Sequence, residues 1–175
     1  KLVERSLIEM GFEEFTEIQK LTIPLIKEGR DVIGHSQTGT GKTAAFALPI
    51  IDDLDFESGE IQAIILCPTR ELAVQVKAEI DKIGKYIPQL KTISVYGGEP
   101  ISKQIYALKR KPQIVIGTPG RTIDHINRKL IKLDKVKYLV LDEADEMLKM
   151  GFIEDIETII ESTNDDRQTT MFSAT

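Results

Sequence analysis

Apolar positions along the chain form two alternating kinds of segment. Short runs rich in Val, Ile and Leu predict strands, and some, such as 138–141, are apolar throughout, as strands of a parallel sheet covered on both faces are. Longer segments place apolar residues three and four apart, which predicts helices. This alternation predicts an α/β domain with a mostly parallel β-sheet and helices on both faces. The expected strands are 31–35, 63–67, 92–96, 113–117, 137–142 and 169–173, and the expected helices are 44–53, 71–85, 102–109, 122–128 and 153–162.

The composition is typical of one soluble globular domain. The chain has 175 residues, of which 41% are hydrophobic and 29% are charged, so it can bury a sizeable core. No apolar run approaches the roughly 18 residues of a membrane span, and the N-terminal residues lead into no signal-peptide pattern. Because the chain begins on Lys1 and stops at Thr175 at the end of a predicted strand, we expect it to be an excerpt of a longer protein.

The net charge of −5 excludes a protein that binds nucleic acid through a general basic coat, so any nucleic-acid site must be local. Two basic runs, 109–111 and 128–137, are typical of solvated surface, with a ligand contact as the alternative. Cys67 is the only cysteine, which excludes an intrachain disulfide framework and fits a small core residue in a reducing cytoplasm.

A glycine-rich segment follows the first predicted strand and opens a helix. Its glycines let backbone N–H groups turn inward around a phosphate, and the helix N-terminus behind them attracts the anion. Lys42 would reach the β- and γ-phosphates, and the Thr43 hydroxyl would ligate Mg²⁺. The strict phosphate-loop pattern begins with Gly where this chain has Ser36, whereas the rest of the pattern matches. The predicted nucleotide-binding residues here are Gln37, Thr38, Gly39, Thr40, Gly41, Lys42 and Thr43.

An acidic pair closes the buried strand at 138–141. Asp142 would leave the sheet at the same edge as the phosphate loop, where it could hold Mg²⁺, partly through water. Glu143 could then orient and deprotonate an attacking water. An acidic pair after a strand is also typical of a helix N-cap, but the nearby phosphate loop favours catalysis, with Glu143, Lys42 and Asp142 as the catalytic group.

At residues 142–145 the sequence resembles the DEAD-box ATP-dependent RNA helicases, and the resemblance extends over essentially the whole chain. It implies a P-loop NTPase fold of the RecA type, with residues 1–175 as the helicase ATP-binding domain, ATP and Mg²⁺ as cofactors, RNA as partner and a cytoplasmic location. It also implies a second RecA-like domain, which this sequence lacks. The motifs that carry the resemblance are Gly11-Phe12 through Gln19, Pro68-Thr69-Arg70-Glu71-Leu72-Ala73, Gly97-Gly98, Thr118-Pro119-Gly120-Arg121, Asp142-Glu143-Ala144-Asp145 and Ser173-Ala174-Thr175.

The segment 11–19 is predicted to read adenine. Gln19 resembles the glutamine that the family uses for this purpose, and a side-chain amide can pair with adenine N6 and N7. Phe12 would stack on the base. Thr16 and Gln19 also form a capping-box pattern, which would occupy the amide locally. The family usually has proline where this chain has Phe15, and its upstream aromatic residue would fall before Lys1.

Two segments that follow strands and open helices are predicted to bind RNA. Each combines a Thr at the expected N-cap with an Arg, and the resemblance assigns both, together with a Gly-Gly turn, to the RNA backbone. Contacts to the backbone carry no base information, so binding should be independent of sequence. Ordinary capped helices and a plain turn are the alternative. The predicted RNA-binding residues are Pro68, Thr69, Arg70, Gly97, Gly98, Thr118, Pro119, Gly120 and Arg121.

The resemblance also predicts a coupling element. The hydroxyls of Ser173 and Thr175 are expected to bond Asp145 and so to link the nucleotide site to strand separation. Phosphoryl transfer further needs positive charge on the transferred group, usually from an arginine finger, and no arginine here is an obvious candidate. The second RecA-like domain is expected to supply it.

The sequence is compatible with three classes of function. The leading hypothesis is ATP hydrolysis coupled to local unwinding of RNA duplexes. A second is an ATP-gated RNA clamp or scaffold that unwinds little, because the same motifs serve both uses. A third is a different P-loop ATPase that acts on DNA or drives a transporter, against which stand Gln19 and the acidic residues at 142–145.

Overall fold

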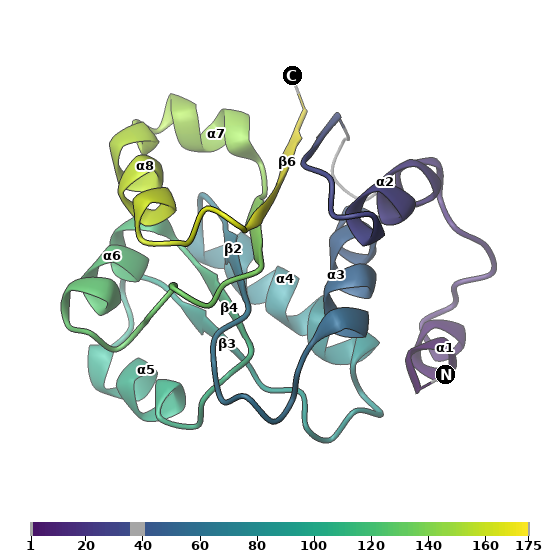
Figure 1. The fold of residues 1–175 in the computed structure, drawn as a ribbon, viewed down its shortest axis with the longest axis horizontal. Helices are drawn as coiled ribbons and strands as arrows, with labels where there is room; N and C mark the ends of the chain where they lie inside the picture. The colour runs from purple at the N-terminus through teal and green to yellow at the C-terminus, as the bar shows by residue number, and fades with distance from the viewer. Residues whose placement is uncertain (1, 36–40, 175) are drawn as a thin grey trace.

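A six-stranded, all-parallel sheet forms the centre of the molecule (Figure 1). The computed structural model describes residues 2–35 and 41–174. In the described part of the chain the strand order is β1-β6-β5-β2-β4-β3, which confirms the predicted fold class and all six expected strands. The strands are β1 Val32–His35, β2 Ala63–Leu66, β3 Thr92–Val95, β4 Ile114–Gly117, β5 Tyr138–Leu141 and β6 Gln168–Ser173.

Helices cover both faces of the sheet (Figure 1). The first four pack together on one face and the last four on the other. Crossovers between parallel strands are right-handed, and the chain reverses its direction across the sheet after β3, so the later helices fall on the opposite face. On the first face are α1 Leu2–Glu9, α2 Glu17–Lys27, α3 Lys42–Asp53 and α4 Arg70–Ile83; on the second are α5 Ile101–Leu108, α6 Pro119–Asn127, α7 Ala144–Lys149 and α8 Ile153–Glu161.

Side chains of the central strands alternate between two hydrophobic cores. Ile65 of β2 faces the core under α3 and α4, whereas its neighbours Ile64 and Leu66 face the core under α5 to α8. All four residues of β2 are buried, which explains why this strand is apolar at every position. In the first core the rings of Phe46 and Phe172 lie with centroids 5.8 Å apart and join α3 to β6.

Three helices were not among those expected. Helix α1 packs against α4, with the Ser6 hydroxyl donating to the carbonyls of Val3 and Ile83. Helix α2 continues through Pro24 because Ile23 and Ile26 on either side are buried against the core. Helix α7 has only 6 residues, too few to show a period in the sequence. Each of these depends more on tertiary contacts than on its own periodicity.

The carboxyl ends of the strands lie along one edge of the sheet, and four helices begin directly beyond them. Helices α3, α4, α6 and α7 follow β1, β2, β4 and β5, so their N-termini converge there. This edge carries the predicted motifs. None of the helices within the described residues is both long and apolar enough to cross a membrane.

The ring of Phe46 is 0% exposed, so its removal should leave a cavity in the first core. We expect Phe46→Ala to lower the free energy of unfolding by about 3–5 kcal/mol, measured by urea denaturation. Leu21→Ala is the control, since Leu21 is 60% exposed and its loss should change stability by less than about 0.5 kcal/mol. Equal effects of the two substitutions would contradict the burial of Phe46 and the exposure of Leu21.

Candidate nucleotide and RNA site

A buried ion pair joins the start of α3 to the end of β5. The Nζ atom of Lys42 lies 2.9 Å from Oδ1 of Asp142, and both side chains are almost completely buried. The sheet produces this contact because β1 and β5 both end at the same edge, with only β6 between them. Removal of one partner would leave the other charge buried and unpaired, which costs about 3–5 kcal/mol in such pairs.

The Asp142 carboxylate is suited to hold a second cation. It is 0% exposed, and apart from Lys42 neither oxygen accepts a hydrogen bond from the described residues. A buried carboxylate with unused lone pairs is a good ligand for Mg²⁺, which prefers oxygen. Thr43, at the second position of α3 and also buried, lines the same cavity as Asp142. The residues present therefore fit the predicted magnesium site.

Glu143 has an unusual backbone and an unusual environment. Its φ of 52° and ψ of 52° are left-handed, a conformation that residues with a side chain seldom adopt and that clusters at functional sites. Burial raises the pKa of its carboxyl above the ordinary value; Lys42 opposes this effect, and the charge of Asp142 adds to it. Glu143 occupies the N-cap position of α7, yet its side chain makes no capping bond there. The carboxylate is thus left available for other chemistry.

Two adjoining cavities meet at Lys42 and Glu143. One, of about 320 Å³, also contains Phe12, Gly41 and Asp142 in its wall. Residues predicted to bind adenine, phosphate and metal are therefore brought together around one space.

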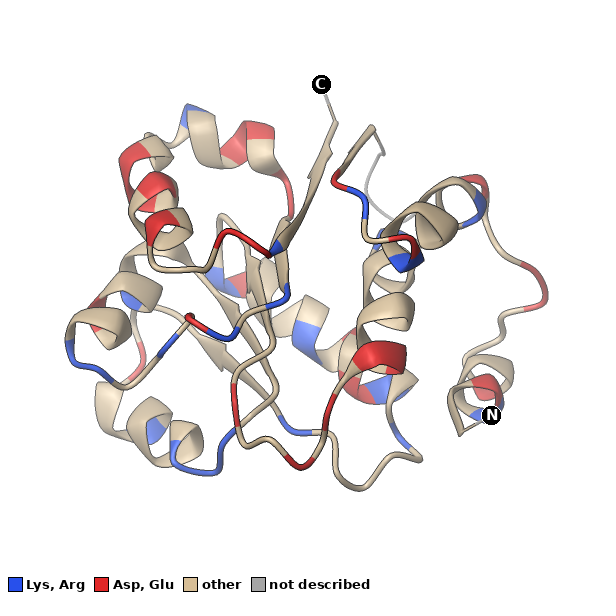
Figure 2. Cartoon of the chain, in the orientation of Figure 1, with Lys and Arg blue, Asp and Glu red and all other residues tan. Residues whose placement is uncertain are grey.

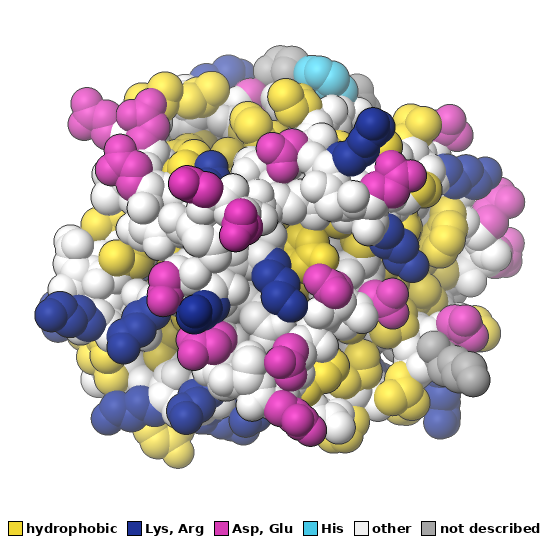
Figure 3. Space-filling model, viewed as in Figure 1, with side chains coloured by type: hydrophobic (Ala, Val, Ile, Leu, Met, Phe, Trp, Pro, Cys, Tyr) yellow, Lys and Arg dark blue, Asp and Glu magenta, His cyan; other side chains and the backbone are white. Residues whose placement is uncertain are grey.

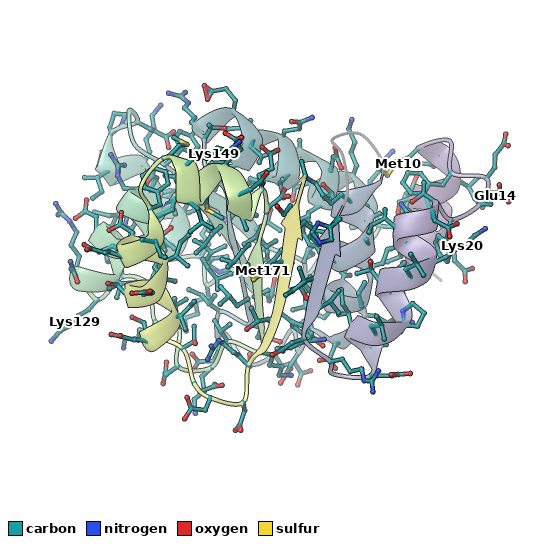
Figure 4. All side chains as sticks on the ribbon, turned by 90° about the horizontal axis from the view of Figure 1, so that it is seen from above. Met10, Glu14, Lys20, Lys129, Lys149 and Met171 are labelled. Atoms are coloured by element: carbon teal, nitrogen blue, oxygen red, sulfur yellow. The ribbon has the colours of Figure 1, made fainter. Side chains whose placement is uncertain are left out.

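The second cavity, of about 270 Å³, connects that space to the segment after β2. It is lined by Pro68, Thr69, Asp145 and Ala174 as well as by the two shared residues Lys42 and Glu143. In Figure 4, which is seen from above the view of Figure 1, the labelled Met10 and Lys149 lie on opposite sides of β6. Asp145 and Ser173, two of the residues of the predicted coupling element, each interact with another group. Ser173 is paired with His35 where β6 lies beside β1.

The amide of Gln19 makes hydrogen bonds within the chain through both its oxygen and its nitrogen. Its Oε1 accepts from the backbone N–H of Thr16 at 2.9 Å, which confirms the capping box. Its Nε2 donates to the carbonyl of Gly41 at 3.0 Å. A Cβ at residue 41 would lie 2.3 Å from that nitrogen, so only glycine, at φ +81°, allows this contact. The structure thus ties the segment 11–19 to the phosphate loop and leaves adenine recognition as a prediction.

The predicted RNA-binding segments lie next to each other. The guanidinium of Arg70 stacks over the ring of Tyr96, with its Cζ 4.7 Å from the ring centroid. Tyr96 directly precedes Gly97 and Gly98 in the sequence. Thr69 caps α4 by accepting from Leu72 N at 3.2 Å. These contacts place the start of α4 beside the Gly-Gly turn.

A buried glutamine links the Gly-Gly turn to the start of α6. Gln104 donates to the carbonyl of Tyr96 and to the carboxylate of Glu99, each at 2.9 Å. Its Oε1 accepts from Arg121 at 3.1 Å and from His125 at 2.8 Å. Arg121 also donates to the Glu99 carbonyl at 3.1 Å. Sequence reasoning missed Gln104 and His125, because only the packing of α5 against α6 shows what they contact.

Some predicted details of the site differ or cannot be placed. Thr118 occupies the N-cap position of α6 with Pro119 as the first helical residue, but the Thr118 side chain makes no capping bond. Its carbonyl instead accepts from the hydroxyl of Thr122 at 2.8 Å. Gly120 has open space around it. The predicted residues Gln37, Thr38, Gly39, Thr40 and Thr175 lie outside the described residues.

The parallel sheet, its strand order and the lysine at the start of α3 define a RecA-like domain of the P-loop NTPase class. The family model for DEAD/DEAH box helicases matches residues 16–175. The chain belongs to this family.

Relatives in bacteria and archaea agree with this assignment. An ATP-dependent RNA helicase CshA of Listeria monocytogenes is 58% identical over 99% of this chain, and one of Limosilactobacillus reuteri is 59% identical over 100% of it. The chain spans 33% and 34% of those proteins, about a third of their length. The crystal structure of a DEAD box protein from Methanococcus jannaschii matches with a TM-score of 0.93 and 48% identity, covering 99% of this chain and 47% of that one.

The Gln104 network should make stability depend on pH. Burial lowers the pKa of His125 below its ordinary 6.5, and the nearby Arg121 lowers it further. When the pH falls through 6.5, His125 becomes protonated in the unfolded chain while it stays neutral in the folded chain. The free energy of unfolding should therefore decrease.

We expect the urea concentration at the unfolding midpoint of the wild type to decrease when the pH is lowered from about 7.5 to about 5.5. His125→Gln keeps a donor for Gln104 but does not titrate, so its midpoint should vary less over that range. Identical pH profiles for the two proteins would contradict the assignment of this effect to His125.

Proposed function

We propose that residues 1–175 form the ATP-binding half of an ATP-dependent RNA helicase. The observation that carries the proposal is the buried Lys42–Asp142 pair beside Glu143, at the edge where the helix N-termini converge. This arrangement offers a positive charge for phosphate, an oxygen ligand for a metal and a carboxylate of raised pKa in one place. Membership of the helicase family and the RNA helicases among the relatives support the choice of substrate.

ATP would lie in the cavity of about 320 Å³ between α3, α4 and the segment before α2. Phe12 would stack on adenine, and Gln19 would exchange a contact within the chain for one with the base. Residues 37–43 would hold the phosphates. Thr43 and Asp142 would hold Mg²⁺, which neutralises phosphate charge. Lys42 would leave Asp142 for the β- and γ-phosphates, and Glu143 would take a proton from the attacking water.

RNA would cross the neighbouring surface as a single strand bound by its backbone. The charges available there are Arg70 and Arg121, each held in place by an intramolecular contact. The open backbone at Gly97 and Gly120 would allow a sugar-phosphate chain to approach closely. Because such contacts ignore the bases, we propose that binding is independent of sequence.

A second RecA-like domain would complete the site by supplying arginine to the transferred phosphate. Asp145, Ser173 and Thr175 would then couple the nucleotide state to RNA strand separation. Asp145 and Ala174 border the cavity that joins the nucleotide and RNA segments, which supports this role. The buried, unpaired Cys67 fits a cytoplasmic location.

Glu143→Gln tests the catalytic assignment. In a protein that joins this chain to a second RecA-like domain, we expect RNA-stimulated ATP turnover to fall by at least about 100-fold, because a general base is lost. ATP affinity, measured with a fluorescent analogue, should persist. Glu154→Gln on α8 is the matched control. Unchanged turnover in the Glu143 variant would refute the assignment, and rapid RNA-stimulated turnover by residues 1–175 alone would refute the need for a second domain.

Arg121→Gln tests the RNA site. Loss of one phosphate contact should weaken binding of a single-stranded RNA and reduce the slope of log affinity against log salt by about 0.7. Arg30→Gln, which removes an exposed arginine away from the site, should leave both values unchanged. An Arg121 variant with wild-type RNA affinity and slope would show that Arg121 makes no RNA contact.

A further inference from the structure

Helices α5 and α6 connect the proposed RNA site to the opposite edge of the sheet. Helix α5 begins after the Gly-Gly turn at 97–98, and α6 begins at Pro119. Both end near the amino ends of the strands, where the chain turns back toward β4 and β5. With 8 and 9 residues, these helices are about 12–14 Å long. An RNA strand that leaves the proposed site along them would reach their C-termini within a few nucleotides.

A hollow of about 390 Å³ lies where the two helices end. Its rim carries four exposed lysines, and its apolar floor includes Leu108 and Leu130. Within the described residues none of these lysines takes part in an ion pair, and Glu60 is the only carboxylate that lines the hollow. In a chain of net charge −5 this is a local excess of positive charge. The rim lysines are Lys109, Lys111, Lys129 and Lys132.

Two of the rim lysines stand where glycine would be easier to accommodate. Lys111 and Lys129 follow the ends of α5 and α6 with φ of 58° and 62°, in the left-handed region. Glycine is the usual residue at such positions because a Cβ is disfavoured there. Each instead projects a charged side chain from the end of its helix, and the Lys111 stem lies over Gly59. The same unusual choice at two adjacent helix ends points to a use for the charge.

The exposed face of α5 continues the same chemistry toward the Gly-Gly turn. Tyr106 is 75% exposed, and Lys103 lies three residues before it, on the same face of the helix. An exposed aromatic ring among lysines is typical of surfaces on which bases of single-stranded nucleic acid stack. Figures 2 and 3 show Lys and Arg gathered around α5 and α6, whereas Asp and Glu gather around α7 and α8.

We propose that the exposed face of α5 and the lysine-rimmed hollow extend the RNA-binding surface, and that they hold the phosphodiester backbone of a single strand that leaves the first site. The lysines contact phosphates, and Tyr106 and the apolar floor contact bases. An acidic peptide would satisfy the lysines, but the surface leads directly from the proposed RNA site, which favours RNA. The inference rests on the proposed function for the identity of its ligand.

The test compares RNAs of two lengths on residues 1–175, by fluorescence anisotropy at low salt. One oligouridylate of about 6 nucleotides fills the first site, and one of about 15 also reaches the hollow. Lys111→Gly together with Lys129→Gly should weaken binding of the longer RNA on the order of tenfold and lower its salt slope by about 1.4. Binding of the shorter RNA should not change. Lys20→Gln with Lys149→Gln is the control of equal charge.

Stability separates a binding role from a structural one. Glycine suits both left-handed positions, so the double glycine variant should melt at or above the temperature of the wild type. A lower melting temperature would mean that the lysines serve to cap their helices. Tyr106→Ala should weaken binding of the longer RNA several-fold, whereas Tyr106→Phe, which keeps the ring, should leave its affinity unchanged.

Other outcomes overturn the inference in distinguishable ways. Wild-type affinity of the glycine variant for the longer RNA would remove the hollow from the RNA path, while loss of binding in Arg121→Gln would still support the first site. If the double glycine variant bound the longer RNA like the wild type but no longer bound a polyglutamate peptide that the wild type binds, the hollow would be assigned to acidic proteins. Failure of the wild type to bind either RNA at low salt would contradict both the proposed function and this extension.

Discussion

The ion pair between Lys42 and Asp142 is the constraint on which the rest of the site depends. Two opposite charges are almost completely withdrawn from water, and only their mutual contact compensates for the lost hydration. The pair requires that a loop after β1 and the end of β5 meet at one edge, which the parallel sheet with β6 between them ensures. Because neither charge has another strong partner within the described residues, a phosphate for the lysine and a metal for the aspartate would together replace what each loses. The pair is therefore well suited to be opened by a nucleotide.

The same interaction connects the two halves of the site. Lys42 and Glu143 line both the cavity that would hold ATP and the cavity that leads to Pro68 and Thr69. A movement of the Lys42 side chain would therefore change the shape of both cavities. On the nucleotide side, the hydrogen bond from Gln19 to the carbonyl of Gly41 joins the start of α2 to the phosphate loop. The Gln19–Gly41 contact is direct, so a change in either of these two segments must be accommodated by the other.

The pattern of apolar residues predicted the strands and the helices with a regular period, whereas the elements it missed are held by tertiary contacts. All six strands followed from short β-branched runs, because a strand buried on both faces tolerates few polar residues. Helix α2 was missed because Pro24 interrupts its pattern, although burial of its neighbours holds it together. The capping box and the adenine contact both fit Gln19 in the sequence, and the structure shows the first of them. Gln104 gave no signal of its own, since its four partners come from two other segments, the turn at 96–99 and helix α6.

The placement of charge explains how an acidic chain can present surfaces to a polyanion. The sum of −5 hides a separation in which acidic residues occupy α7 and α8, whereas lysines follow the ends of α5 and α6 (Figure 2). Screening limits the reach of each charge to about 10 Å, so a strand of RNA responds to the nearest helix and not to the total. At Lys111 and Lys129 the backbone adopts a conformation that favours glycine. A side chain kept against the preference of its own backbone is better explained by what the charge contacts than by the turn that it occupies.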